Sequence, residues 1–313
     1  MKLLCLDFAN LVIRHSANPY NTAVDLQQRP VGGAVGALGQ SLRLIEEEKP
    51  THLLVGKDGS RSEGFRRQLE ASYKAHRADA DEALLHQFGV AYKGIEILDW
   101  PVMAMPGYEA DDVIASAATA FPGEVLVITG DKDMLALCSE KTIIRLLRPG
   151  GYRDCRPEDC QDIFGVTPEH VCDYKALVGD TSDGISGVPG IGPKSALALL
   201  AEHDGLEDIL LALDAGTDII PGAGTRVTKI LREHRQKAET SYSLAELICD
   251  LDLGDADTLA CPPVPDDDSI GEALAEAGLH DLRRRLPGGE KHRPAPVSAG
   301  TAFDQALRQM AKS

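Results

Sequence analysis

Three short apolar segments that each end in an aspartate constrain the fold of this chain more than any other feature. KLLCLD, THLLVGKD and VLVITGD have the length and continuous hydrophobicity of strands that are buried on both faces of a sheet. Segments with helical periodicity separate them, beginning with GGAVGALGQSLRLIEEE. Strands that alternate with helices predict an α/β fold with a mainly parallel central sheet flanked by helices. The carboxyl ends of parallel strands share one edge of such a sheet, so we expect three aspartates to meet there: Asp7, Asp58 and Asp131.

The rest of the chain extends this alternation and then changes in style. EALLHQFGVAYKG and residues 109–120 have helical periodicity, whereas IEILDW with the following PVMAM is predicted as a strand. From about Thr167, short helices are joined by tight turns, and they include HVCDYKALVG and PKSALALLAEH. We therefore expect an α/β domain over residues 1–166, a helical subdomain over residues 167–286 and a flexible tail over residues 287–313.

Six more carboxylates lie at turns or at the ends of predicted elements. Three open the helix of residues 109–120, and the others follow the third apolar segment or lie in a glycine-rich turn: Glu109, Asp111, Asp112, Asp133, Asp180 and Asp183. One acid is enough to cap a helix and to interact with its dipole, so three within four residues indicate a further role. Converging carboxylates repel each other unless cations bind between them, and oxygen-only ligands favour Mg²⁺ or Mn²⁺. The nine acids therefore predict a divalent-metal site of the kind that hydrolyses phosphodiesters.

The net charge of −17 does not exclude nucleic acid as a partner, because basic residues are concentrated locally. Residues 61–77 contain five lysines and arginines against two glutamates, and residues 229–237 contain four against one. We interpret both segments as DNA-contacting surfaces, and the run Arg283-Arg284-Arg285 as an ordinary solvated helix face.

A glycine-rich turn lies between two of the predicted short helices. Gly187, Gly190 and Gly192 let the backbone approach a ligand closely and leave amide groups free at the start of PKSALALLAEH. Such a helix start binds a phosphate without contacting bases, and Lys194 can reach the same phosphate. A plain packing turn is the alternative. The pattern helix-G-V-P-G-I-G-P-K-helix, with Val188 in the turn, favours a contact with the DNA backbone.

Other features of the sequence argue against a membrane protein, a secreted protein and a zinc protein. No apolar run approaches the roughly 18 residues of a membrane span, and Asp7 interrupts a start that otherwise resembles a signal peptide. The seven cysteines are scattered without a C-x-x-C motif. We therefore expect reduced thiols, a cytoplasmic location and no zinc site at Cys155 and Cys160.

Five stretches together resemble a known family. They are Leu6-Asp7, YKAHR at 73–77, GYEADDVIASAA at 107–118, VITGDKDML at 127–135 and ALVGDTSDGISGVPGIGPKSA at 176–196. In this order they are similar to motifs of the bacterial and phage 5′-nucleases, namely flap endonucleases and the 5′→3′ exonuclease domain of DNA polymerase I. The resemblance covers residues 1 to about 253 and implies a PIN-like, resolvase-like fold with a helix-hairpin-helix subdomain. Because no polymerase sequence follows, it implies a stand-alone enzyme, expected to be a monomer that cleaves DNA at 5′ flaps and 5′ ends.

The resemblance also implies a role for each group of residues. Two clusters would hold two or more ions and activate water: Asp7, Asp58, Glu109, Asp111 and Asp112 in the first, and Asp131, Asp133, Asp180 and Asp183 in the second. Residues 59–82 would form an arch around the single strand, in which Lys74 and Arg77 contact the phosphate and Tyr73 stacks on a base. Arg14 would contact another phosphate, and the turn at residues 187–192 would hold the duplex and could bind K⁺.

Departures from the family pattern leave alternatives open. Phe8 follows Asp7 where a small residue is common, and Lys57 precedes Asp58 where phenylalanine is usual, so Asp58 is the least secure ligand. A PIN-type ribonuclease would share the acidic sheet edge, although the glycine turn and YKAHR argue against it. A non-catalytic DNA-binding module would not need the complete set of acids. The helix-like AFDQALRQMAK in the tail is either a partner-binding peptide or a frayed terminus.

Overall fold

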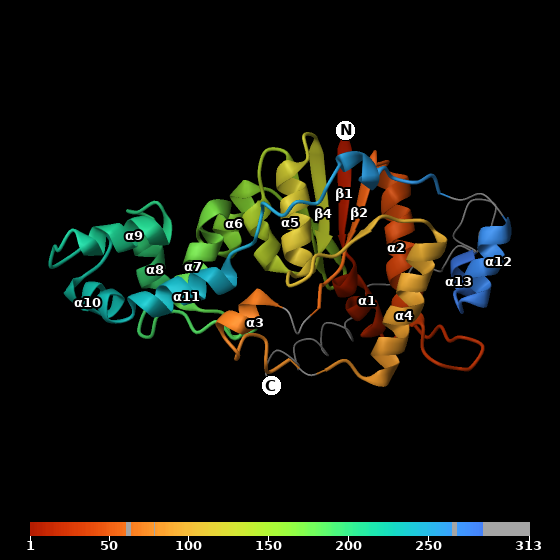
Figure 1. Ribbon diagram of the computed structural model, residues 1–313, viewed down its shortest axis with the longest axis horizontal. Helices are drawn as coiled ribbons and strands as arrows, with labels where there is room; N and C mark the ends of the chain where they lie inside the picture. Colours follow the sequence, from red (N-terminus) through yellow and green to blue (C-terminus); the bar gives the residue numbers. More distant parts are fainter. Residues whose placement is uncertain (61–63, 78, 265–267, 284–313) are drawn as a thin grey trace.

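The computed structural model describes residues 1–60, 64–77, 79–264 and 268–283, and a six-stranded sheet forms its core (Figure 1). The strands lie in the order β3-β2-β1-β4-β5-β6. The parallel strands are β1 (Lys2–Asp7), β2 (His52–Gly56), β3 (Val102–Met103), β4 (Glu124–Thr129) and β5 (Thr142–Arg148). At the edge, β6 (Gly151–Cys155) pairs with β5 in the antiparallel direction. The predicted α/β fold with a mainly parallel sheet is confirmed.

Helices cover both faces of the sheet, and alternate residues of β1 point to the two faces. Leu4 and Leu6 pack with α1 (Phe8–Ser16), α2 (Gly32–Glu48) and α4 (Glu82–Ile97). Leu3 and Cys5 pack on the other face with α5 (Ala110–Ala120), the 3₁₀ helix η2 (Lys132–Leu137) and α6 (Pro157–Ile163). This cover on both faces explains why the strands read as continuous apolar runs.

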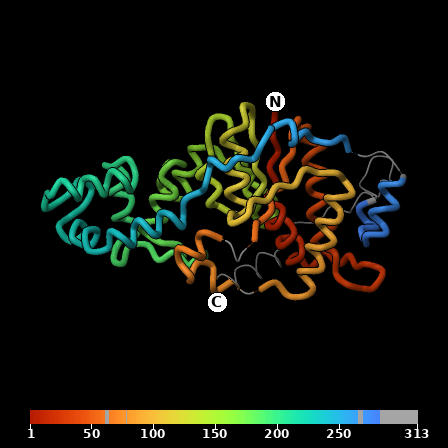
Figure 2. Tube along the Cα trace, in the orientation of Figure 1, coloured from red at the N-terminus to blue at the C-terminus, as the bar shows by residue number. Residues whose placement is uncertain are grey.

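A helical subdomain lies at one end of the long axis of the molecule (Figure 1). Its helices are η3 (Pro168–His170), α7 (Val171–Val178), α8 (Pro193–Leu200), α9 (Gly205–Asp214), α10 (Thr225–Glu233) and α11 (Arg235–Ala245). The chain then runs back along the sheet domain, as Figure 2 shows, and forms η4 (Ala256–Leu259) beside β2. The last described helices, α12 (Asp268–Glu276) and α13 (His280–Arg283), contact α4 and α2. The elements η4, α12 and α13 therefore contact the sheet domain, although the sequence analysis assigned residues 167–286 to the helical subdomain. The predicted tail of residues 287–313 lies outside the described residues.

The helical subdomain contains one kind of turn twice. VPGIG at 188–192 precedes α8, and IPGAG at 220–224 precedes α10. Gly190 and Gly222 have φ angles of +88° and +70°, a conformation that glycine adopts without strain. Each turn packs against the helix that follows the other turn: a Cβ at Gly190 would meet Ile230 of α10, and a Cβ at Gly222 would meet the backbone of Ala198 in α8. The two helical hairpins are thus packed into each other.

The predicted strand over IEILDW and PVMAM is wrong for IEILDW and confirmed for part of PVMAM. α4 continues to Ile97 because Ala91, Ile95 and Leu98 lie on one helical face and are all buried. Of the segment that follows, β3 is the only strand. Ile95 and Ile97 therefore belong to the preceding helix, Leu98 is its C-cap, and Trp100 follows it.

Two strands, β5 and β6, were not predicted. Arg145 lies in the middle of the β5 run TIIRLLR, and it is buried through ion pairs with Glu48 and Asp154. Those partners come from α2 and β6, so local sequence could not reveal them. Within the described residues, no helix is both long and apolar enough to cross a membrane.

Candidate metal centre

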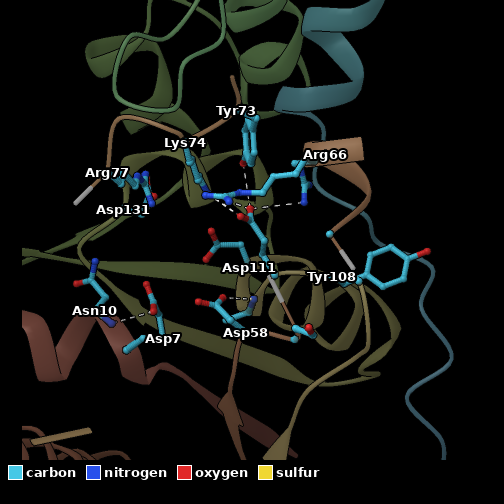
Figure 3. A pocket seen from close by; sticks show the side chains of 18 of the residues that line it. Asp7, Asn10, Asp58, Arg66, Tyr73, Lys74, Arg77, Tyr108, Asp111 and Asp131 are labelled. Atoms are coloured by element: carbon cyan, nitrogen blue, oxygen red, sulfur yellow. Dashed lines mark hydrogen bonds and ion pairs between the residues drawn. The ribbon is translucent and has the colours of Figure 1, made fainter. Parts of the chain in front are cut away.

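A pocket at the carboxyl edge of the sheet is lined by acids from four separate segments (Figure 3). Asp7 ends β1, Asp58 and Asp131 follow β2 and β4, and Asp111 lies in the first turn of α5. The strands are parallel, so their carboxyl ends share this edge. Glu109, the N-cap of α5, lines the same pocket, so the structure brings together five of the nine acids there.

Asp7 is held in one direction by two hydrogen bonds. The N–H of Asn10 donates to its Oδ1 at 3.2 Å, and the hydroxyl of Thr129 donates to its Oδ2 at 2.7 Å. The residue is only 7% exposed. Burial raises the pKa of Asp7 to about 6, and the charges of Asp131 and Asp58 contribute repulsion. Asp7 is thus a preorganised carboxylate whose charge is poorly compensated.

Asp58, Asp111 and Asp131 share this deficit of positive charge. Burial raises the pKa of Asp111 well above its usual range, and the charges of Asp7 and Asp131 raise it further. Among the described residues, these four acids have no ion pair with a basic side chain, whereas the fifth pocket acid, Glu109, is paired with Lys74. As they stand, no three His, Cys, Asp or Glu side chains in the described part of the chain are close enough together to hold an ion. Oxygen-only donors that repel each other across a pocket nevertheless fit a hard divalent cation.

The basic segment predicted as the arch reaches this pocket. α3 (Phe65–Leu69) is followed by turns that bring Tyr73, Lys74 and Arg77 to the pocket wall. The ammonium of Lys74 donates to Oε1 and Oε2 of Glu109 at 3.0 and 2.9 Å, and the hydroxyl of Tyr73 donates to Oε2 at 3.0 Å. The N–H of Lys74 also donates to the carbonyl of Asp183 at 2.9 Å. Glu109 thus holds Tyr73 and Lys74 of the basic segment in place. Residues 61–63 and 78 of the predicted arch lie outside the described residues.

Asp112 points into the protein and not into the pocket. It is fully buried, and the two terminal nitrogens of Arg66 each donate to one of its oxygens at 2.7 Å. The N–H groups of Glu109 and Ile248 donate to the same carboxylate at 3.0 and 3.1 Å. This placement corrects the expectation of a metal ligand: Asp112 neutralises a buried arginine and caps α5.

The three remaining acids lie beside basic side chains: Asp133, Asp180 and Asp183. Lys175 contacts the first two, and Arg77 contacts the third. Sequence reasoning missed Lys175, although its position four residues after Val171 places it on the buried face of α7. A lysine on such a face is itself a signal, because a buried ammonium requires charged partners.

Two further predicted contacts are not available in this arrangement, those of Arg14 and of the Tyr73 ring. The guanidinium of Arg14 donates to the carbonyl of Arg148 at the turn between β5 and β6, and Arg14 does not line the pocket. Tyr73 is 3% exposed and packs with Ile185 and Leu244, so its ring is not available to a base in this arrangement. The phosphate contact of Arg14 stays a prediction.

The glycine turn before α8 leaves its helix start open to solvent. Gly187 has a φ of +64°, and Val188 is buried beneath the turn. Gly192 is the N-cap of α8, and a Cβ built there would meet no atom within 4 Å. Lys194 is exposed in the first turn of the helix. Amide groups and one cation are therefore accessible, and the DNA contact of this turn stays a prediction.

Comparison with known proteins identifies the two halves of the chain. Residues 2–165 match the family model described as 5′-3′ exonuclease, N-terminal resolvase-like domain. Residues 166–267 match the model described as 5′-3′ exonuclease, C-terminal SAM fold. Among solved structures, T5 5′-exonuclease with bound zinc has a TM-score of 0.63 at 21% identity, covering 89% of this chain and 100% of that one. The catalytic core of Rad2 in complex with a DNA substrate has a TM-score of 0.53 at 15% identity, covering 91% and 90%.

Curated relatives are closer in sequence. The chain is 30% identical over 276 residues to DNA polymerase I of Bacillus caldotenax, which covers 86% of this chain and 31% of the polymerase. The chain therefore spans less than a third of that relative. It is also 30% identical over 260 residues to the 5′-3′ exonuclease of Aquifex aeolicus, with 82% of this chain and 86% of the relative covered. On these matches, the chain belongs to the 5′-3′ exonuclease family.

Proposed function

We propose that this protein is a metal-dependent, structure-specific 5′-nuclease that hydrolyses DNA phosphodiesters at 5′ flaps and 5′ ends. The pocket in Figure 3 carries the proposal, because acids without basic partners among the described residues share its walls with Lys74 and Arg77. Cleavage of a phosphodiester requires groups that bind the anionic phosphate and groups that neutralise the charge that develops on it. This pocket offers basic side chains for the first task and cation-binding carboxylates for the second.

Four acids would hold the ions of this site, and Mg²⁺ or Mn²⁺ is the class of ion that suits them: Asp7, Asp58, Asp111 and Asp131. When bound, the ions supply activation of the attacking water and stabilisation of the leaving oxygen. The hydrogen bonds from Thr129 and Asn10 keep Asp7 directed for this role. The zinc ions in T5 5′-exonuclease support the choice of a divalent ion.

Lys74 and Arg77 would bind and orient the scissile phosphate. Burial alone would lower the pKa of Lys74, but the charge of Glu109 raises it, so the side chain remains an ammonium. A phosphate that enters the pocket competes with Glu109 for this ammonium. The hydroxyl of Tyr73 holds Glu109 in place during this exchange, which makes Tyr73 a positioning residue.

The duplex would bind the helical subdomain. The open helix start at Gly192 and the exposed Lys194 suit a backbone phosphate, and the carbonyl groups of the same turn are a candidate K⁺ site. The DNA in the Rad2 complex supports a nucleic-acid ligand for this fold. We further propose that the protein acts as a cytoplasmic monomer.

Cleavage of 5′-labelled flap DNA in the presence of Mg²⁺ tests the proposal, with a matched RNA strand and an unbranched duplex alongside. Asp131→Asn and Asp111→Asn should each lower the single-turnover rate on flap DNA by at least about 100-fold, in line with the loss of a preorganised charge. Asp99→Asn is the matched control, because Asp99 is exposed in the turn after α4 and does not line the pocket. Cleavage of RNA in preference to flap DNA, or full activity of Asp131→Asn, would show that the proposal is wrong.

A further inference from the structure

A lysine lies between two of the acids that the family resemblance assigns to a second group of ions. Lys175 projects from α7 and is 4% exposed. Its ammonium contacts Oδ2 of Asp133 and lies 3.0 Å from Oδ2 of Asp180. Burial alone would lower the pKa of Lys175, but these two carboxylates raise it above its ordinary value. The side chain is therefore a permanent cation inside the acid group.

Asp183, which belongs to the same group, has basic partners of its own, and the fourth acid of the group, Asp131, lines the pocket. A terminal nitrogen of Arg77 lies 2.6 Å from its Oδ1, and the ammonium of Lys74 lies 3.9 Å from its Oδ2. One buried oxygen in the group, Oδ1 of Asp133, has no hydrogen-bond partner in the described part of the chain. Basic side chains thus compensate Asp133, Asp180 and Asp183, in contrast to the four pocket acids that are unpaired among the described residues: Asp7, Asp58, Asp111 and Asp131.

These residues do not fit a second divalent ion in their present arrangement. An ion shared by Asp133 and Asp180 would need the space between them that the ammonium occupies, and two positive charges so close together repel strongly. The side chain of Lys175 has little room to move away from this position, because α7 packs against α11 and η2 and Leu177, two residues further along α7, is fully buried. Moving the ammonium away from its carboxylates would leave a buried charge unpaired.

We propose that Lys175 takes the place of an ion here, so that divalent ions bind only where the four acids face the pocket. The inference rests on the metal-dependent function proposed above and specifies which acids serve it. Asp133 and Asp180 then act as positioning residues, because their ion pairs with Lys175 fasten α7 to η2. The N-cap of η2 is Asp131, so the tethered cation holds a pocket acid in place.

Counting the Mn²⁺ ions bound to the DNA-free full chain tests this inference. Titration with Mn²⁺, in which electron paramagnetic resonance reports the free ion, gives the number of ions per chain. We expect Asp180→Asn to bind as many ions as wild type, Lys175→Met to bind one more, and the variant with both changes to lose that extra ion. Lys175→Arg keeps a cation in place and should bind the same number as wild type.

Two results would overturn the inference: one ion fewer in Asp180→Asn than in wild type, or no additional ion in a folded Lys175→Met. If circular dichroism shows that Lys175→Met does not fold, the comparison of Asp180→Asn with wild type decides the question alone. Asp111→Asn separates this test from the proposed function. A number of ions that does not fall in Asp111→Asn contradicts the pocket assignment, whereas the count in Asp180→Asn bears on Lys175.

Discussion

Substitution by asparagine should change the stability of the protein in opposite directions at the neighbouring positions Asp111 and Asp112. Asp112 forms a buried ion pair with Arg66, whereas Asp111 faces the pocket and is repelled by Asp7 and Asp131. Replacement by asparagine keeps the shape of either side chain and removes its charge. Asp112→Asn therefore breaks an attraction inside the protein, and Asp111→Asn relieves a repulsion.

The two effects can be estimated from the contacts. Removal of one partner of a buried ion pair costs about 3–5 kcal/mol of stability. Asparagine at position 112 keeps an oxygen that can still accept some of the four hydrogen bonds. We therefore expect Asp112→Asn to lower the free energy of unfolding by about 3 kcal/mol. One unit of pKa shift corresponds to about 1.4 kcal/mol, and the pKa of Asp111 is raised well above its usual range. Asp111→Asn should therefore stabilise the metal-free protein, because it removes a charge that burial and the neighbouring acids disfavour.

Urea unfolding in the presence of a chelator, followed by circular dichroism, measures both free energies of unfolding. An unchanged dependence on urea shows that each substitution acts on stability and not on the extent of unfolding. Addition of Mg²⁺ should stabilise wild type and Asp112→Asn by similar amounts, and Asp111→Asn by less. If Asp112→Asn unfolds at the wild-type midpoint, or if Asp111→Asn is the destabilised variant, the division between a structural and a metal-binding acid is refuted.

Three other substitutions test separate parts of the structure. In a chelator, the stability of Asp7→Asn relative to wild type should increase as the pH rises from about 4 to about 6. Burial raises the folded-state pKa of Asp7 to about 6, above its ordinary value of 3.8. Over this pH range the folded wild type loses a proton that it binds more tightly than the unfolded chain does, and Asp7→Asn has no such proton to lose. The full difference is about 3 kcal/mol by urea unfolding, and an equal difference at about pH 4 and about pH 7 would contradict it. Lys194→Ala should weaken flap-DNA binding in filter assays without divalent ions and lower the slope of log affinity against log salt by about 1, while Lys93→Ala, on the exposed side of α4, should change neither. Gly222→Ala should cost at least about 2 kcal/mol, because φ is +70° and the new Cβ would lie 2.3 Å from the carbonyl oxygen of Ala198. Gly216→Ala has a similar φ of +78° but open space, so it should cost only about 1 kcal/mol in the same thermal or urea unfolding experiment, and equal losses would show that the close approach is unimportant.

The strands β1, β2 and β4 and the acidic edge that they form were predictable because their signals are local. A buried parallel strand needs a continuous apolar run, and an aspartate just after it can only lie near the carboxyl edge. Asp7, Asp58 and Asp131 satisfied both conditions, and all three line the pocket. The position of each acid relative to a strand was thus enough to group them.

The errors concern partners that lie far away in sequence. Asp112 is directed by Arg66 and by the N–H of Ile248, from segments 46 and 136 residues away, so nothing near it distinguishes it from Asp111. Lys175 acquires its role from Asp133, 42 residues earlier. A local pattern shows that a residue is an acid at a helix start. Only the fold shows whether a lysine or arginine side chain forms an ion pair with that acid.

The interlocking of the two glycine turns has a consequence for how the helical subdomain folds. Gly190 needs α10 in place, and Gly222 needs α8 in place, so neither helical hairpin has its packing surface without the other. The four helices α7 to α10 should therefore open and close as one cooperative unit, with a common free energy of local unfolding in hydrogen exchange. In that case, a substitution in the turn at 220–224 would also loosen the turn at 188–192. The two turns would respond together although Gly224 lies 30 residues after Lys194, the exposed cation beside the first turn.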